Sequence, residues 1–155
     1  MIELFAVKPF WITEEARTSP IHFEENMSLS ALLLDNDYYE LLSKGKIILQ
    51  GYSVLSNSYL IILKAKAWLD LSQKKESREY QVDSRDIKKH LNDIARLAGS
   101  LEGNEKVILP VSIQKDMQKF LEALKEKIEL IPQNKDIVLE RNQIIDSLEK
   151  LLGND

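Results

Sequence analysis

The first 55 residues carry short apolar runs, rich in β-branched and aromatic side chains, which are separated by polar segments. The runs at residues 2–12 and 20–24 predict strands. The run at 29–42 fits a strand followed by a helix, or a helix throughout, and its periodicity does not choose between the two. Residues 46–55 predict a short strand, or a hairpin with Gly51 at its bend.

Beyond residue 55 the apolar positions recur with helical spacing, and they predict helices at about 57–75, 83–98, 112–130 and 136–152. The start of the second helix is the best defined. Asp83 stands at the cap with Asp86 three residues later, and Val82 and Ile87 are spaced as a hydrophobic staple.

These elements predict an α+β fold, in which a short amino-terminal sheet precedes a helical carboxyl-terminal bundle. We expect a strand-rich part at 1–55, two helices at 56–103 and a helical region at 104–155. The hydrophobic share of 44% and the charged share of 30% are ordinary for a folded soluble protein, so a core should form.

Charge and composition narrow the classes of function. The net charge of -4 means that the overall field does not attract nucleic acid, so a polyanion site must be a local patch. The chain has no cysteine, which excludes disulfides and thiolate zinc sites. It has no apolar run of membrane-spanning length and no signal-peptide pattern at its amino terminus, so we expect a cytoplasmic protein without a membrane partner.

Lys64 is out of place on its helix. At 100° per residue it falls among Leu60, Ala67, Trp68 and Leu71, in the middle of the apolar face. A lysine there either extends past its neighbours to solvent or meets an anion. One interpretation is therefore extension along Trp68, and the other is a phosphate site in a cleft beside this helix. By contrast, Lys66 and Asp70 are four residues apart on one side of the helix. A solvent-exposed ion pair between them explains both positions without a functional role.

On the second helix, His90 and Asp93 lie at the border of the buried face, three residues apart. A local hydrogen bond between them is the structural interpretation, and a catalytic role is the alternative. Lys89 belongs to a basic stripe on the outer face of the helix. The stripe predicts at most a weak contact with nucleic acid, which would guide an RNA acceptor to an active site. The stripe consists of Arg85, Lys88, Lys89 and Arg96.

Together, "LIILKAKAWLDL" at 60–71 and "RDIKKHLNDIARL" at 85–97 resemble the later motifs of bacterial nucleotidyltransferase-fold proteins of the AbiEii-like abortive-infection toxin type. Lys64 matches the lysine of the first motif. Lys89, His90 and Asp93 match the second, with His90 where these toxins usually have aspartate. The resemblance implies that Lys64 and Lys89 bind nucleotide phosphates, that Asp93 and His90 are catalytic, and that the sheet is the remnant of a nucleotidyltransferase fold.

The family's glycine pair and D-x-D metal motif precede these helices, and we expect them outside this chain. "GS" at Gly99 and Ser100 ends a helix and does not replace them. The resemblance implies that Glu3 is a metal ligand, and that Mg²⁺ and NTP bind only if a missing amino-terminal half completes the site. Asp35 and Asp37 look like a metal pair, but no glycine-rich turn precedes them, so they are interpreted as turn or helix-start residues.

Two functions follow from this pattern. The first is the carboxyl-terminal portion of a nucleotidyltransferase-like protein, which transfers NMP to an RNA or protein acceptor in the complete family and is inactive alone. The second is a non-catalytic interaction module, such as a toxin–antitoxin component, whose partner is an antitoxin, the missing half or a second copy. The second function predicts exposed apolar surface on the amino-terminal strands.

Overall fold

Two structural units make up the chain, Met1–Lys44 with a sheet and one helix, and Gly45–Asp155 with a hairpin and a helical bundle. The computed structural model describes residues 4–7, 18–23, 27–78 and 81–153, with side chains from residue 35 onward. The α+β prediction is confirmed. In the part that the model describes, no helix is both long and apolar enough to cross a membrane.

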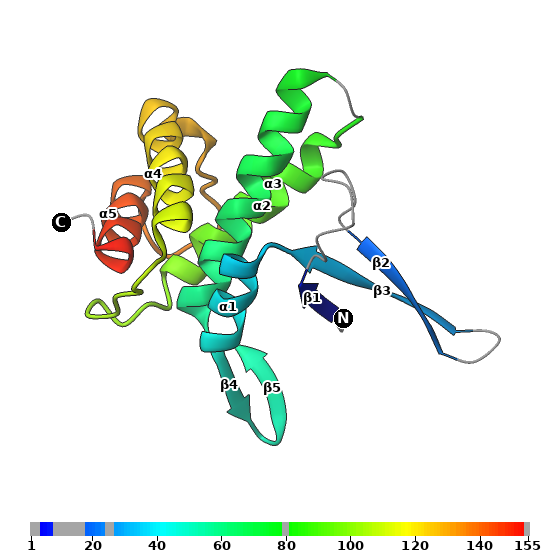
Figure 1. Cartoon of the computed structure of the whole chain (residues 1–155). Helices are drawn as coiled ribbons and strands as arrows, with labels where there is room; N and C mark the ends of the chain where they lie inside the picture. The colour runs from blue at the N-terminus through cyan, green and yellow to red at the C-terminus, as the bar shows by residue number, and fades with distance from the viewer. Residues whose placement is uncertain (1–3, 8–17, 24–26, 79–80, 154–155) are drawn as a thin grey trace. The chain divides into compact units, whose positions relative to one another are not determined.

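The first unit is built around one central strand. β3 (Met27–Leu34) lies between β1 (Leu4–Val7), with which it pairs in parallel, and β2 (Thr18–Phe23), with which it pairs antiparallel (Figure 1). Pairing on both sides suits its nearly continuous apolar sequence. Helix α1 (Asn36–Lys44) follows at once, so the ambiguous run at 29–42 is a strand and then a helix.

Asp35 ends the strand and begins α1. Its carboxylate oxygen accepts a hydrogen bond from the backbone N–H of Tyr38 at 3.0 Å, which satisfies a donor that the first helical turn leaves open. Asp37 lies in that first turn. The interpretation of both aspartates as helix-start residues is therefore confirmed.

The second unit opens with the predicted hairpin, β4 (Lys46–Leu49) and β5 (Tyr52–Leu55). Both turn residues have positive φ, 51° at Gln50 and 83° at Gly51. This is the type I′ geometry, whose twist matches that of the paired strands. Glycine adopts it without steric cost, which explains Gly51 at the bend.

Four α-helices follow: α2 (Asn57–Ser77), α3 (Ser84–Ala98), α4 (Val111–Glu126) and α5 (Arg141–Leu152). Helix α2 packs against both α3 and α4, and α5 packs against α3 and α4 (Figure 1). Each helix contributes several fully buried apolar side chains. The largest are Phe120, Ile61, Ile62, Ile94, Ile113, Met117, Leu124, Ile144, Leu148 and Leu151.

The start of α3 follows the sequence prediction in part. The Asp83 carboxylate caps the helix by accepting from the backbone N–H of Arg85 at 2.8 Å. It also accepts from the Arg85 guanidinium, so Arg85 is neutralised locally. The backbone N–H of Asp86 donates to the backbone carbonyl of Asp83, at 3.1 Å.

Two other helix boundaries were predicted wrongly. Helix α4 begins at Val111 after Pro110, and its α-helical part ends at Glu126, before a 3₁₀ turn over Ile128–Leu130 (η1). The last helix begins at Arg141, not near Asp136. Asn134 holds residues 134–137 in a turn through its side chain and carbonyl, and Glu140 with Gln143 forms a reciprocal capping box.

Lys66 joins α2 to α4. Its ammonium lies 3.3 Å from the Asp70 carboxylate, as predicted, and 2.9 Å from that of Asp116 on α4. Burial alone would lower the pKa of Lys66, but its hydrogen bond to Asp116 and the charge of Asp70 outweigh burial and raise it. Lys66 therefore stays charged and stabilises the contact between the helices.

We predict that Gly45→Ala destabilises the second unit by about 1–3 kcal/mol, because the added methyl group would overlap Cβ and Cγ of Tyr59. These atoms are close to the backbone and cannot rotate away. The matched control is Gly103→Ala, where the methyl group meets no atom within 4 Å. Urea unfolding measures both variants, and equal free energies of unfolding would contradict the prediction.

Candidate functional site

Lys64 of α2 and Asp93 of α3 form an ion pair across the contact between the two helices. Their Nζ and Oδ2 atoms are 2.7 Å apart, and their side chains are 22% and 26% exposed. Lys64 precedes the fully buried Ala65, and Asp93 precedes the fully buried Ile94. Both residues therefore lie at the rim of the packed interface, where the ammonium of α2 contacts the carboxylate of α3. The anion that Lys64 meets is thus a carboxylate of this chain, and the phosphate site beside this helix stays a prediction.

His90 lies one turn before Asp93 on α3 and is half-buried. Its Nδ1 atom is inaccessible to solvent and has no hydrogen-bond partner among the described residues. Burial lowers the pKa of His90 below its ordinary 6.5, and repulsion from Lys64 lowers it further, against the opposing effect of Asp93. The weaker charges are Lys89, which also lowers it, and Asp86, which raises it. The imidazole is therefore neutral at pH 7.

Lys64, His90 and Asp93 thus combine an ammonium, a neutral imidazole and a carboxylate at one edge of the α2–α3 interface. An ammonium on a flexible stem binds phosphate as a point charge. A neutral imidazole accepts a proton near neutral pH, and a carboxylate orients a hydroxyl or an imidazolium. The predicted local hydrogen bond between His90 and Asp93 is not seen, because Asp93 pairs with Lys64 instead.

The remaining predicted site residues lie elsewhere. Lys89 is exposed and lines a groove between α2, α3 and the end of α4, and Lys64 does not line that groove. Glu3 lies outside the described residues. Within the described ranges, no three histidine or acidic side chains gather in a way that could hold a metal ion.

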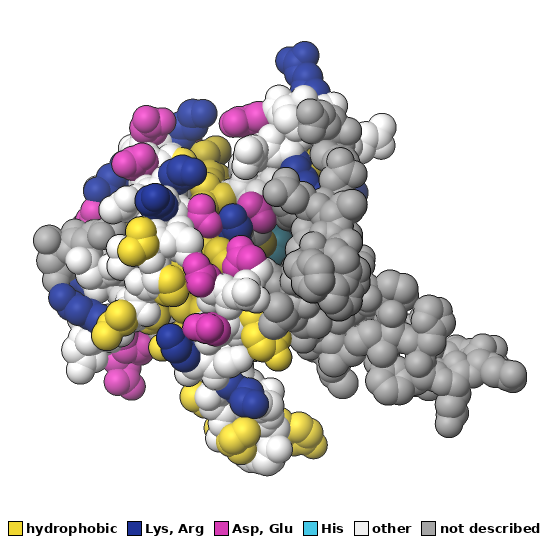
Figure 2. All heavy atoms as spheres, viewed as in Figure 1, with side chains coloured by type: hydrophobic (Ala, Val, Ile, Leu, Met, Phe, Trp, Pro, Cys, Tyr) yellow, Lys and Arg dark blue, Asp and Glu magenta, His cyan; other side chains and the backbone are white. Residues whose placement is uncertain are grey.

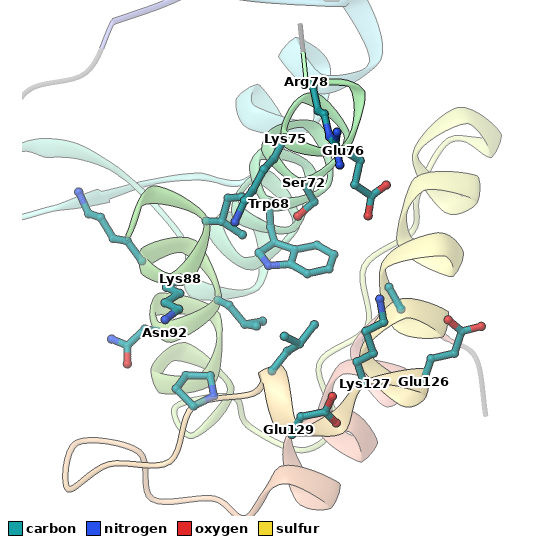
Figure 3. Close-up of a pocket in the computed structure, with 16 residues that line it drawn as sticks. Trp68, Ser72, Lys75, Glu76, Arg78, Lys88, Asn92, Glu126, Lys127 and Glu129 are labelled. Carbon is teal, nitrogen blue, oxygen red and sulfur yellow. The ribbon is translucent and has the colours of Figure 1, made fainter. Parts of the chain in front are cut away.

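The groove that contains Lys89 was not foreseen (Figure 3). Of the basic stripe, only Lys88 and Lys89 line it, since Arg85 pairs with Asp83. Lys75 and Arg78 at the end of α2 and Lys127 after α4 complete its basic side chains. No local motif marks these three, because they approach α3 only through the packing of the helices.

No family model, curated protein or solved structure matches the chain. The resemblance to nucleotidyltransferase-fold toxins therefore rests on the motif residues themselves.

We predict that His90 makes the folded state sensitive to mild acid. Its pKa is depressed in the folded state, so below pH 6.5 the unfolded chain binds a proton that the folded chain does not. Stability that is present above pH 6.5 is therefore lost as the pH falls toward the folded pKa. In urea unfolding at about pH 7.5 and 5.5, His90→Gln should lose less stability on acidification than the wild type. An equal loss in both would contradict the assignment.

Proposed function

We propose that the chain is the carboxyl-terminal portion of a nucleotidyltransferase-like protein and contributes its nucleotide-phosphate and acceptor-orienting residues. The observation that supports this is the ion pair between Lys64 and Asp93, 29 residues apart in sequence and 2.7 Å apart in space. These are the lysine and the final aspartate of the two motifs. If α2 and α3 served only to stabilise the fold, their packing would not require these two motif positions to contact each other.

In this proposal Lys64 exchanges Asp93 for a nucleotide phosphate, to which its ammonium donates through a rotation of its stem. Asp93 is then released to accept a hydrogen bond from the acceptor hydroxyl. As the oxygen of that hydroxyl bonds to the α-phosphorus of the NTP and pyrophosphate leaves, the hydroxyl proton passes to the neutral His90 imidazole. Loss of the nearby positive charge to a phosphate raises the pKa of His90, which favours this proton transfer.

The proposal assigns no metal step to the described residues, among which no three histidine or acidic side chains gather around a possible metal ion. Lys89 is not included among the phosphate ligands, since it lines the separate groove. The site formed by Lys64, His90 and Asp93 would therefore serve transfer only beside a metal-binding half.

We predict that Lys64→Ala weakens ATP binding to the chain about tenfold, which corresponds to one charge-assisted contact. Asp93→Asn should strengthen ATP binding, because it removes the carboxylate that competes for Lys64. Isothermal titration in buffer without Mg²⁺ measures both. In the wild type, the NMR titration of the His90 ring should shift to higher pH when ATP is bound.

The matched control is Lys125→Ala, which removes a charge paired with Glu149 at a distant helix contact. Binding that is equally weak in Lys64→Ala and Lys125→Ala would reject the phosphate role. The isolated chain, incubated with labelled NTP, Mg²⁺ and tRNA, should transfer no NMP, and robust transfer would reject the assignment as a half-site.

The second candidate function is an interaction module, and the β4–β5 hairpin supports it. Ile47 and Leu49 share one face of the hairpin with their cross-strand partners Val54 and Tyr52. Their exposed fractions are 48%, 59%, 36% and 75%. Figure 2 shows hydrophobic side chains gathered on this projecting element. Apolar surface of this kind is typical of a contact site. The amino-terminal strands, where such surface was predicted, have no described side chains.

We predict that Leu49→Ser with Tyr52→Ser abolishes self-association of the chain without lowering its melting temperature, because both side chains are exposed. Sedimentation equilibrium of the wild type and the double variant measures this. Asp136→Ser with Lys135→Ser, on an exposed turn, is the control. If the wild-type chain stays monomeric at high concentration, the hairpin does not serve self-association.

A further inference from the structure

The groove between α2, α3 and the end of α4 has an apolar floor and a volume of about 1080 Å³ (Figure 3). Trp68 and Leu91 are 6% and 4% exposed and form its base. The Trp68 ring is held edge-to-face against Phe120, with the ring centres 5.4 Å apart. The floor is therefore a fixed surface of the core. Its apolar residues are Trp68, Ile87, Leu91, Ala123, Leu130 and Pro132.

The charged side chains at the rim are divided between the two sides of the groove. Four basic residues, Lys75, Arg78, Lys88 and Lys89, lie at the end of α2 and the start of α3, with Glu76 as the acidic residue there. Glu126 and Glu129 lie on the opposite side with Lys127, at the end of α4 (Figure 3). One side is thus strongly basic and the other is acidic on balance.

Three of these four basic side chains, those of Arg78, Lys88 and Lys89, form no ion pair with a carboxylate in the described part of the chain. Lys75 donates a hydrogen bond to the Ser84 hydroxyl at 2.7 Å, and its charge also acts on the Asp83 carboxylate. Elsewhere in the bundle, Lys64, Lys66 and Lys125 are each paired with a carboxylate. An excess of basic over acidic side chains around an apolar floor, in a chain of net charge -4, favours a ligand that carries both acidic and apolar groups.

The chemistry of the groove favours a polypeptide over nucleic acid. Single-stranded nucleic acid binds by stacking its bases on exposed aromatic rings. The described residues of the floor are mainly aliphatic, and the one aromatic ring among them, Trp68, is almost buried. Glu126 and Glu129 would also repel a phosphate backbone. Aliphatic side chains spaced along one face of a helix match such a floor.

We propose that this groove binds an amphipathic helix of a partner protein, with its acidic amino-terminal turns at Lys75, Arg78, Lys88 and Lys89. Its basic carboxyl-terminal turns then lie at Glu126 and Glu129. Helices commonly carry acidic residues in the first turn and basic residues in the last, because these charges interact favourably with the helix dipole. The two sides of the groove therefore fix the direction of the bound helix. The site is separate from Lys64, His90 and Asp93, so the proposal is independent of the proposed function.

The test uses a labelled, end-blocked synthetic peptide of about 16 residues, long enough to span about 24 Å as a helix. It has leucine at i, i+3, i+4, i+7 and i+11, glutamate in its first half and lysine in its second. A second peptide carries the same leucines with the charge order reversed. Fluorescence anisotropy with the full chain should show about tenfold tighter binding of the first peptide, with a loss of affinity at high salt.

Lys88→Glu with Lys89→Glu should weaken binding of the first peptide about tenfold. Leu130→Glu, at a floor residue that is 45% exposed, should weaken it similarly without unfolding the chain. The charge-matched control is Lys115→Glu with Lys135→Glu, two exposed lysines outside the groove. No binding, equal binding of both peptides, or equal effects of the groove and control variants would overturn the proposal. So would tighter binding of a single-stranded RNA of the same length.

Discussion

The packing of α2 against α3 is the contact on which both candidate sites depend. Its buried face includes Ala65 on α2 with Ala95 and Ala98 on α3, and such small side chains let two helix backbones approach closely. A residue beside a buried position then lies at the rim of the interface. Lys64 and Asp93 occupy such rim positions on facing helices, and their charges meet at 2.7 Å.

The two lysines of "KAKA" show how the same residue type acquires different roles from its surroundings. Lys66 bridges Asp70 on its own helix and Asp116 on α4, and these two carboxylates hold its pKa above the ordinary value. Lys64 has a carboxylate partner in Asp93 and stands beside a histidine whose pKa it lowers. The first arrangement stabilises a helix contact. The arrangement around Lys64 places a cation beside a neutral imidazole, and the proposed phosphate site rests on it.

Helix α3 presents different chemistry on different faces. His90 and Asp93 belong to the Lys64 edge, Lys88 and Lys89 to the groove, and Leu91, Ile94, Ala95 and Ala98 to the core. A single short helix thus contributes to stability, to the candidate phosphate site and to the proposed contact with a partner.

The sequence by itself determined the α+β class, the β4–β5 hairpin, the capped start of α3 and the anomalous position of Lys64. All of these are local, since apolar periodicity, a cap residue or a glycine at a bend acts within a few residues. The start of α5 was predicted wrongly because the turn made by Asn134 and the Glu140–Gln143 capping box compete with helical periodicity over 136–140. Only the tertiary structure decided that Asp93 is the anion at Lys64, that Lys89 faces a groove instead, and that residues from three helices share that groove. These pairings join residues far apart in sequence. They depend on how close the helices pack and on their rotation about their axes, which no local pattern encodes.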